Sequence, residues 1–319
     1  RRLMKQAKVL ADTVGDPHAI ALSCLADGMM TMARGEWKPA LRFSEEALTI
    51  LRERCVGVTW ELNMAQNLVI WALMYLGEIG EVSRRVPELL DRARRSGNLY
   101  IATELCTRSN YVWLAADEPD EGERVTIDSI ARWSQKGFHR QHYSAVLARI
   151  QTALYRGDAD SAWRLLDELE AVLRHTHLTR VQVMRVESHF LRARSALAMA
   201  AMYGRQPRFL AVARVASRRI ARERMPWSDP IALLIDGAVA HLEGNTRVAL
   251  ARLHEAAARF DRADMQLYAA VARRRIGDLE DSAHAREMQR QADEWMASQG
   301  IKNPPAMTRT LAAGFPDIA

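Results

Sequence analysis

The sequence contains little cysteine and lacks any long apolar run. The three cysteines, Cys24, Cys55 and Cys106, are odd in number and have no paired spacing. They therefore indicate neither a disulfide framework nor a zinc site. No uninterrupted apolar run approaches the ~20 residues that a membrane-spanning helix needs. We expect a cytoplasmic protein with reduced thiols and no membrane partner.

The sequence also lacks the short motifs that carry enzyme chemistry. It has no phosphate-binding glycine loop, no kinase catalytic loop and no H-E-x-x-H among its nine histidines. The histidine pairs 139/142 and 175/177 have no further ligands at metal-site spacing, and the acidic stretch 117–123 lacks the order of a calcium loop. We therefore predict no catalytic, cofactor-binding or metal-binding residue and no enzyme activity. An enzyme on a helical toroid is the rival, which would need a buried cluster of acid and histidine.

Strand patterns are nearly absent, and helical periodicity dominates. Its breaks form two offset series, each with steps of 42, 40 and 40 residues. The first series is Gly15, Gly57, Gly97 and Gly137, and the second is Gly35, Gly77, the loop 117–120 and Gly157. Two offset series predict helices of roughly 15–19 residues joined by turns, stacked as a solenoid. Later breaks follow less strictly, near His175, Gly204, 226–230, Gly244, Asp261, Gly277 and Gly300.

Gly157-Asp158 illustrates one of these turns. A glycine can take a left-handed backbone at the end of one helix, and an aspartate can cap the start of the next. The alternative is a metal or phosphate site. We interpret the pair as the turn within a helical hairpin.

Small residues recur in register with the turn glycines. They lie seven positions before the glycine and five and twelve positions after it. The pattern is complete in and just before two segments, GEWKPALRFSEEAL (35–48) and EGNTRVALARLHEAA (243–257). This spacing resembles the tetratricopeptide repeat, although the ~40-residue period exceeds the usual ~34. The resemblance implies an all-α, right-handed superhelical solenoid of about seven helix-turn-helix repeats over 1–299. Residues 300–319 are expected to form a capping tail: a short helix after Pro304-Pro305, docked through Leu311 and Phe315.

Two further segments resemble a narrower group of proteins. Residues 129–198 and the ending EWMASQGIKNPPAMTRTLAAGF (294–315) are similar to the carboxyl-terminal helical region of large bacterial signalling proteins. Those proteins carry a serine/threonine kinase domain and a signal-transduction ATPase. The resemblance implies that this chain is the sensor or partner-docking part of such a protein. Kinase or ATPase activity would then belong to domains outside this chain.

One repeat position predicts a partner-binding column. In tetratricopeptide arrays the position six before the turn glycine points into the concave groove, and here it holds Trp71, Tyr111 and Gln151, besides Met29 and Ala238. Tyr75 and Tyr155 lie two positions before their turn glycines, and Asn67 lies one helical turn before Trp71. Aromatic rings bury much area at low entropic cost, and amides can satisfy a peptide backbone. The predicted partner-binding residues are Asn67, Trp71, Tyr75, Tyr111, Gln151 and Tyr155. The alternative is that long helices close the groove and make these residues core.

Arginines supply most of the +6 net charge, and only five residues are lysine. Two helical stripes are candidates for an anion-binding or basic surface: Arg185, His189 and Arg192 in one, and Arg214, Arg218 and Arg222 in the other. The alternative is the ordinary solvated face of amphipathic helices.

The sequence thus predicts a non-catalytic module that binds a protein or peptide partner, or other domains of a parent chain, in a concave groove. A helical-repeat sensor of a ligand or a nucleic acid, using the basic stripes, is the second hypothesis. A steep loss of nucleic-acid binding with salt would favour it.

Overall fold

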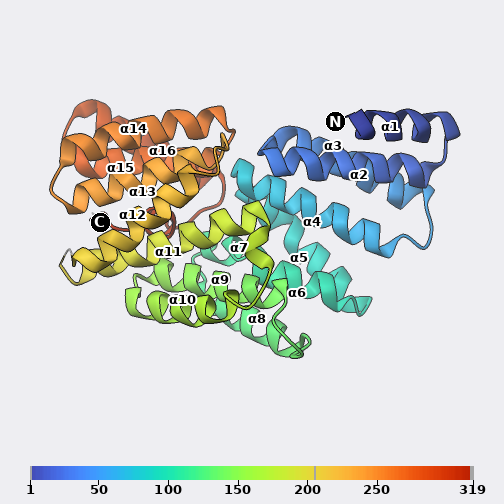
Figure 1. Cartoon of the computed structure of the whole chain (residues 1–319), viewed down its shortest axis with the longest axis horizontal. Helices are drawn as coiled ribbons and strands as arrows, with labels where there is room; N and C mark the ends of the chain where they lie inside the picture. The colour runs from blue at the N-terminus through green and yellow to red at the C-terminus, as the bar shows by residue number, and fades with distance from the viewer. Residues whose placement is uncertain (1, 205, 317–319) are drawn as a thin grey trace. The chain divides into compact units, whose positions relative to one another are not determined.

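The computed structural model describes residues 2–204 and 206–316 (Figure 1). Seventeen α-helices and one 3-10 helix occupy these residues, and no strand occurs among them. The all-α prediction is therefore confirmed. The helices form two compact units, one ending at Glu78 and the other beginning at Ile79.

The first unit consists of four helices that pack on one another in chain order. Its helices are α1 (Arg2–Val14), α2 (Pro17–Arg34), α3 (Trp37–Arg54) and α4 (Thr59–Leu76). Helix α3 packs against both α2 and α4. Their shared core is apolar and contains Leu25, Leu51 and Leu68, because each amphipathic helix can hide its apolar side only against a neighbour.

The second unit continues the same helix-to-helix order. Its first helices are α5 (Ile79–Arg95), α6 (Leu99–Arg108), α7 (Tyr111–Ala115), α8 (Pro119–Arg132), α9 (Arg140–Arg156), α10 (Ala159–Leu173) and the 3-10 helix η1 (Leu178–Arg180). They are followed by α11 (Gln182–Met202), α12 (Pro207–Ala221), α13 (Asp229–Leu242), α14 (Thr246–Arg262), α15 (Gln266–Leu279), α16 (Ala283–Ser298) and α17 (Pro304–Leu311). From α8 to α16 each helix packs on the next along the chain, as expected for stacked helical hairpins.

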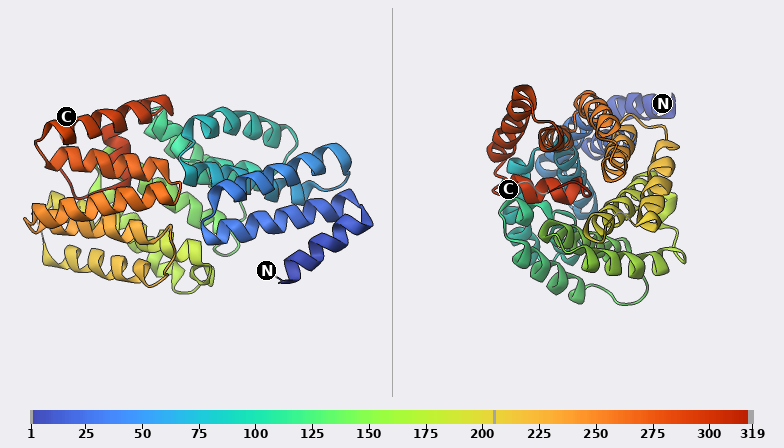
Figure 2. Two further views of the ribbon diagram at one scale, coloured as in Figure 1. Left: turned by 90° about the horizontal axis from the view of Figure 1, so that it is seen from above. Right: turned by 90° about the vertical axis from the view of Figure 1, so that its left-hand side faces the viewer.

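Within the second unit, alternate helices form an inner layer. Helix α11 packs against α9 and α13 as well as against its sequence neighbours α10 and α12. Helix α17, coloured red, lies inside the arc of the green to orange helices (Figure 2, right). It contacts α9, α15 and α16. The inner face of this unit therefore surrounds the C-terminal helix.

The turn glycines take the backbone conformation that the sequence predicts. All seven glycines of the two series have positive φ, from 66° at Gly97 to 88° at Gly77. At the eighth position Asp117 has φ of 56°, so an aspartate occupies the left-handed site that glycine fills elsewhere. At Gly157-Asp158 the glycine ends α9, and the Asp158 side chain accepts a hydrogen bond from the Ser161 amide at 3.0 Å. The predicted hairpin turn is confirmed.

The helix breaks differ from the prediction at two places. The helix expected between Gly97 and Asp117 is split into α6 and α7, where the Asn110 side chain donates to the Ala148 carbonyl of α9 at 3.1 Å. The break predicted near Gly277 lies at 280–282, because α15 continues through Gly277 to Leu279. A Cβ at this position would lie 2.6 Å from Cβ of Gln289 in α16. Gly277 thus permits close packing of two helices and is not a turn.

The small residues predicted from the repeat register do sit at close helix contacts. A Cβ added to Gly28 would lie 2.7 Å from Oγ of Ser44, and one added to Gly237 would lie 3.3 Å from Cγ of Leu253. The register alanines are fully buried: Ala40, Ala47, Ala249 and Ala256. Small side chains at these positions let the two helices of a hairpin approach each other closely. The hand of the superhelix and the count of seven repeats stay predictions.

Candidate functional site

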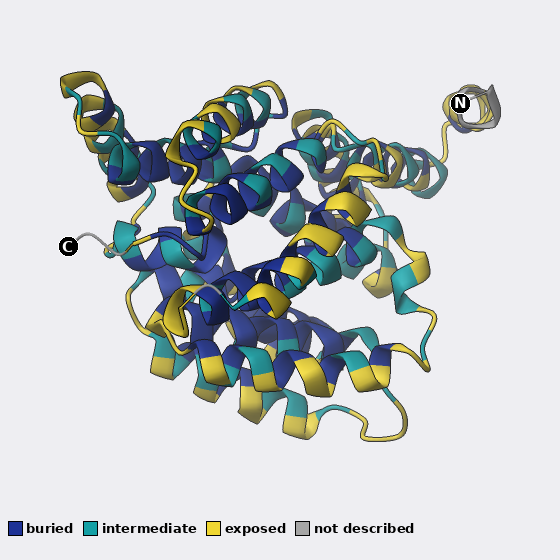
Figure 3. Cartoon of the chain, turned by 60° about the vertical axis from the view of Figure 1, so that its left-hand side comes forward, coloured by how far each residue is buried: buried dark blue, intermediate teal, exposed yellow. Residues whose placement is uncertain are grey.

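The inner face of the second unit is occupied by the chain's own C-terminal segment, residues 301–316. Its side chains are among the most buried in the protein; Met307, Thr308 and Thr310 have no exposed surface. The predicted helix after Pro304 is present, and Leu311 and Phe315 are buried. Helix α17, which carries Leu311, contacts α9 and α15 of the inner layer and also α16. Figure 3 marks the buried residues of the chain in dark blue.

Two buried arginines hold the segment through its main chain. Nη1 of Arg194, in α11, donates to the carbonyl oxygen of Thr310 at 2.8 Å. Arg275, in α15, donates to the Ala312 carbonyl from Nε at 3.1 Å and from Nη2 at 2.9 Å, and to the Pro316 carbonyl from Nη1 at 3.0 Å. Hydrogen bonds from a charged donor are roughly twice as strong as neutral ones. All of these hydrogen bonds go to main-chain carbonyls of the segment.

A buried carboxylate balances the charge of Arg275. Oδ2 of Asp278 lies 2.8 Å from Nη1 of Arg275, and Oδ1 of Asp278 lies 3.4 Å from Nη1 of Arg274. Both guanidinium groups and the carboxylate are almost fully buried. A buried charge is tolerated only when it is paired and hydrogen-bonded. Asp278 therefore makes it possible for α15 to present a cation to the carbonyls of the segment.

The other end of the segment binds the C-terminal ends of α7 and α9. The Lys302 amide donates to the Ala115 carbonyl at 2.9 Å. Arg309 donates to the carbonyls of Leu154 at 3.3 Å and Tyr155 at 2.5 Å. Carbonyls in the last turn of a helix have no partner within the helix, and a cation there also complements the helix dipole. Arg309 thus caps α9.

The segment ends in an aromatic contact. Phe315 stacks on His241 of α13, with ring centroids 5.4 Å apart and an angle of 22° between the rings. The Arg275 guanidinium lies 5.2 Å from the centroid of the same phenyl ring. Gly314, with φ of 94°, passes so close to α11 that a Cβ would lie 3.1 Å from Cβ of Leu197. A glycine is favoured there because its φ is positive and because a side chain would collide with Leu197.

Three of the predicted partner-binding residues meet beside this segment. Nε2 of Gln151 donates to the Tyr111 hydroxyl at 3.2 Å, and both side chains are buried. The Tyr155 hydroxyl donates to Oδ1 of Asp117 at 2.6 Å, and the same oxygen accepts from Nδ2 of Asn303 at 3.3 Å. Burial raises the pKa of Tyr155 well above its ordinary value. The repeat register thus located the inner face, and binding of a partner by these residues stays a prediction.

The other three predicted residues belong to the first unit. Asn67 and Tyr75 are buried in α4, and the Tyr75 ring stacks on Trp37 with centroids 4.1 Å apart. Trp71 is intermediate in exposure. Met29 holds the same register position one hairpin earlier and exposes 48% of its surface. In this unit the register position therefore reaches solvent.

The residues that hold the C-terminal segment were not predicted as a site. Arg194 lies within the mostly apolar stretch RARSALAMAA (192–201), Arg309 lies within AMTRTLA (306–312), and Arg275 is the last of three consecutive arginines. Arginine on an otherwise apolar helix face is a signal of a buried polar contact. That signal is present in the sequence, but it does not say which carbonyls the guanidinium groups would meet.

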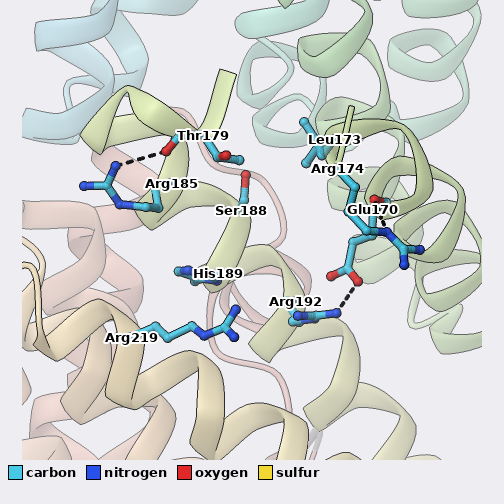
Figure 4. Close-up of a pocket in the computed structure, with 9 residues that line it drawn as sticks. All are labelled: Glu170, Leu173, Arg174, Thr179, Arg185, Ser188, His189, Arg192 and Arg219. Atoms are coloured by element: carbon cyan, nitrogen blue, oxygen red, sulfur yellow. Dashed lines mark hydrogen bonds and ion pairs between the residues drawn. The ribbon is translucent and has the colours of Figure 1, made fainter. Parts of the chain in front are cut away.

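The first predicted basic stripe forms one wall of a pocket of about 550 Å³ (Figure 4). Arg185, His189 and Arg192 line it from α11, and Arg219 lines it from α12. The remaining lining residues are Glu170, Leu173, Arg174, Thr179 and Ser188. The structure therefore brings the three predicted side chains together and adds Arg219, which the sequence reading passed over in favour of its neighbour Arg218.

The second predicted stripe does not join this pocket. Arg214, Arg218 and Arg222 are exposed on α12 and at its C-cap. Arg214 forms an ion pair with Glu243, and with Arg218 it borders a separate depression of about 310 Å³ that also contains Asp236. This surface carries both signs of charge.

Other site classes find no support within 2–204 and 206–316. No group of three or more histidine, cysteine, aspartate or glutamate side chains in these ranges is placed to hold a metal ion. The helices described there are all too short or too polar to cross a bilayer. The sequence matches no known protein-family model, and it has no significant match among curated proteins.

Proposed function

We propose that this chain is a non-catalytic, tetratricopeptide-like interaction module that binds a segment of a partner protein and so regulates a larger signalling protein. The observation that carries the proposal is the C-terminal segment itself. The inner face of the second unit holds sixteen residues of polypeptide largely through guanidinium groups that donate to main-chain carbonyls. Contacts of this kind suit peptide recognition, because every peptide offers the same carbonyls.

In the first unit the same register position is partly exposed at Met29. Met29 exposes 48% of its surface and Met30 40%, whereas Tyr111 and Gln151, at the corresponding positions of the second unit, are buried. Trp71 stands at this position in α4. Methionine and tryptophan supply flexible and large apolar contact area to a bound peptide. The partner segment would accordingly place an apolar anchor side chain on the face formed by α2 and α4.

The larger context of the proposal comes from the sequence. Residues 294–315 resemble the ending of bacterial kinase-ATPase signalling proteins. A module at the end of such a chain would sense a partner and pass that state to catalytic domains elsewhere. The chain's own lack of kinase and ATPase motifs is compatible with a purely regulatory part.

Peptide selection against the full chain tests this function. Peptides enriched from a random library would be labelled and titrated with wild-type protein and with Met29→Glu. We expect the variant to weaken binding about tenfold, because a carboxylate would be desolvated against the apolar anchor. Val56→Glu is the matched control, since Val56 is 96% exposed in the turn before α4. Equal binding by wild type and Met29→Glu would exclude this face as the site.

Ligand sensing is a second candidate, and the pocket of Figure 4 is the observation that favours it. The pocket is concave and basic, whereas the exposed stripe of α12 is partly neutralised by Glu243. A binding site for nucleic acid would require a continuous basic surface that follows the phosphate backbone. The arrangement therefore favours a small anionic ligand over a nucleic acid.

A further inference from the structure

The basic pocket is built where three consecutive helices meet. Helices α10, α11 and α12 and the connection through η1 all contribute lining residues. Its volume of about 550 Å³ falls within the range of small-molecule sites, roughly 300–1,000 Å³. Leu173 provides an apolar surface, and the remaining lining side chains are polar or charged. The pocket can therefore hold a compact charged group together with a small organic body.

The charges of the pocket are unevenly paired. Arg185 is committed to Glu223, with Nε at 2.5 Å from Oε1 and Nη2 at 2.7 Å from Oε2. Arg192 forms an ion pair with Glu170 through Nη2. Four arginines line the pocket, and two carboxylates, those of Glu223 and Glu170, form ion pairs with them. The pocket consequently keeps a positive charge that its own groups do not cancel.

Two of the guanidinium groups have donors that no carboxylate of the described residues pairs. Nε of Arg192 is buried and makes no hydrogen bond within the described part of the chain, although a buried donor left unpaired costs about 1–3 kcal/mol. Arg219 forms no ion pair with any carboxylate in the described ranges. In Figure 4 the Arg219 side chain lies below His189, and the Arg192 side chain lies to the right of Arg219.

His189 lines the pocket beside these cations. Burial, together with smaller contributions from the positive charges of Arg219 and Arg192, lowers its pKa to about 4. An anion bound in the pocket would raise the pKa of His189, because its negative charge would offset the positive charges of the arginines. The neutral ring still offers one N–H donor to such an anion.

We propose that this pocket binds the dianionic phosphate group of a small phosphate monoester. Arg192 and Arg219 donate to the phosphate oxygens, and His189 provides a further donor. Guanidinium groups match the geometry of phosphate oxygens and bind them with charge-assisted hydrogen bonds. The organic part of the ligand lies toward Leu173. This site is independent of the proposed partner face, which lies on α2 and α4.

The pocket favours a small molecule over a phosphorylated protein or a nucleic acid. Nucleic-acid recognition draws on many phosphate contacts, often with stacked aromatic side chains. Here one pocket contains the unpaired donors, and no aromatic residue other than His189 lines it. A single phosphate group is the ligand that this number of donors can satisfy.

Calorimetric titration of the full chain tests the proposal. The probes are inorganic phosphate and glucose 6-phosphate, with glucose as the uncharged control, at constant ionic strength. We expect both phosphates to bind, glucose not to bind, and Arg219→Gln to weaken phosphate binding about tenfold. Arg218→Gln is the matched control: it removes the same charge from the adjacent residue of α12, which lines the other depression. Its affinity should stay within about twofold of wild type.

Other outcomes of this titration would overturn the proposal. Absence of phosphate binding to the folded wild-type chain would do so, and so would equal weakening by Arg218→Gln and Arg219→Gln, which would indicate a diffuse charge effect. A single-stranded oligonucleotide that binds more tightly than either phosphate, with a steep salt dependence, would assign the surface to nucleic acid. Circular dichroism of each variant verifies that the chain is folded. Loss of peptide binding by Met29→Glu would leave these results unchanged.

Discussion

Arg194 in α11 donates a hydrogen bond to the main-chain carbonyl of Thr310 at 2.8 Å, across 116 residues of sequence. The guanidinium is buried and also lies over the ring of Phe190, 4.3 Å from its centroid. This contact ties the last segment of the chain to the middle of the second unit. It makes residues 301–316 part of the core that the earlier hairpins form.

Replacing Arg194 should loosen the C-terminal segment. In Arg194→Leu the Thr310 carbonyl loses its charged donor, and we expect the free energy of unfolding to fall by about 2–3 kcal/mol. Urea denaturation measures the loss, and limited proteolysis should cut sooner near residue 300. Arg164→Leu is the control, because Arg164 and Glu168 form an exposed ion pair worth less than about 1 kcal/mol. Equal resistance of wild type and Arg194→Leu would contradict the anchoring role.

Asp278 should be more costly to change than any exposed carboxylate. Asp278→Asn leaves the buried guanidinium groups of Arg274 and Arg275 without their shared counter-ion. Breaking a buried ion pair from one side typically costs about 3–5 kcal/mol. Denaturant titration should show a loss of that order, against less than about 0.5 kcal/mol for Asp281→Asn, whose carboxylate is 93% exposed. Comparable losses in the two variants would show that burial of the pair is unimportant.

The turns were predictable from the sequence because they depend on local chemistry. A glycine at a helix end, as at Gly157, marks a left-handed backbone whatever surrounds it. The inner register was predictable for a similar reason, since hairpins that repeat at a fixed step place Tyr111 and Gln151 on one face. Both features follow from residues near one another along the chain.

The occupant of the inner face and the full basic pocket were not predictable in this way. Arg194 and Thr310 meet only because the helical arc returns the last segment to α11. Arg219 joins His189 from the second helix of the same hairpin, and whether Arg218 or Arg219 faces the pocket depends on a rotation of α12 that periodicity does not resolve. The packing role of Gly277 was not predictable for a related reason, because its contact with Gln289 comes from another helix.

Two helical glycines should respond in opposite directions to substitution by alanine. Alanine is favoured over glycine in a helix by about 1 kcal/mol. At Gly80 the nearest atom to an added Cβ is 3.5 Å away, so Gly80→Ala should stabilise the protein by up to that amount. At Gly277 the added Cβ would meet Cβ of Gln289 at 2.6 Å and the Ala285 carbonyl oxygen at 3.1 Å. Gly277→Ala should therefore destabilise it by about 1–3 kcal/mol.

Thermal unfolding of the two glycine variants and the wild type tests this pair of signs. A lower midpoint for Gly277→Ala together with an equal or higher midpoint for Gly80→Ala is expected. If both midpoints rose, helix propensity alone would determine the stability of the two variants. The close approach of α15 and α16 at Gly277 would then cost no free energy on substitution.

His189 should make the stability of the protein depend on pH. The charged groups around it are Arg185 and Arg192 on α11, Glu170 on α10 with Arg174 at its C-cap, Arg219 on α12, and Glu223 just after α12. Its pKa is about 4 in the folded chain, against about 6.5 when unfolded. As the pH falls below 6.5, the unfolded chain therefore binds a proton that the folded chain does not, and stability is lost down to pH 4.

The loss should be visible between pH 7 and pH 5. Part of the ring reaches solvent, so we expect a decrease of about 1 kcal/mol in the free energy of unfolding, less than full burial would produce. Urea titrations of wild type and His189→Gln at the two pH values isolate this contribution from that of other groups. The decrease should be smaller by that amount in the variant, which cannot take up the proton.

Sulfate, which stays dianionic over this range, should bind the wild type more tightly at pH 5 than at pH 7, because it favours the protonated ring. If the two chains lost stability in parallel and sulfate binding were independent of pH, His189 would not be held neutral by this pocket.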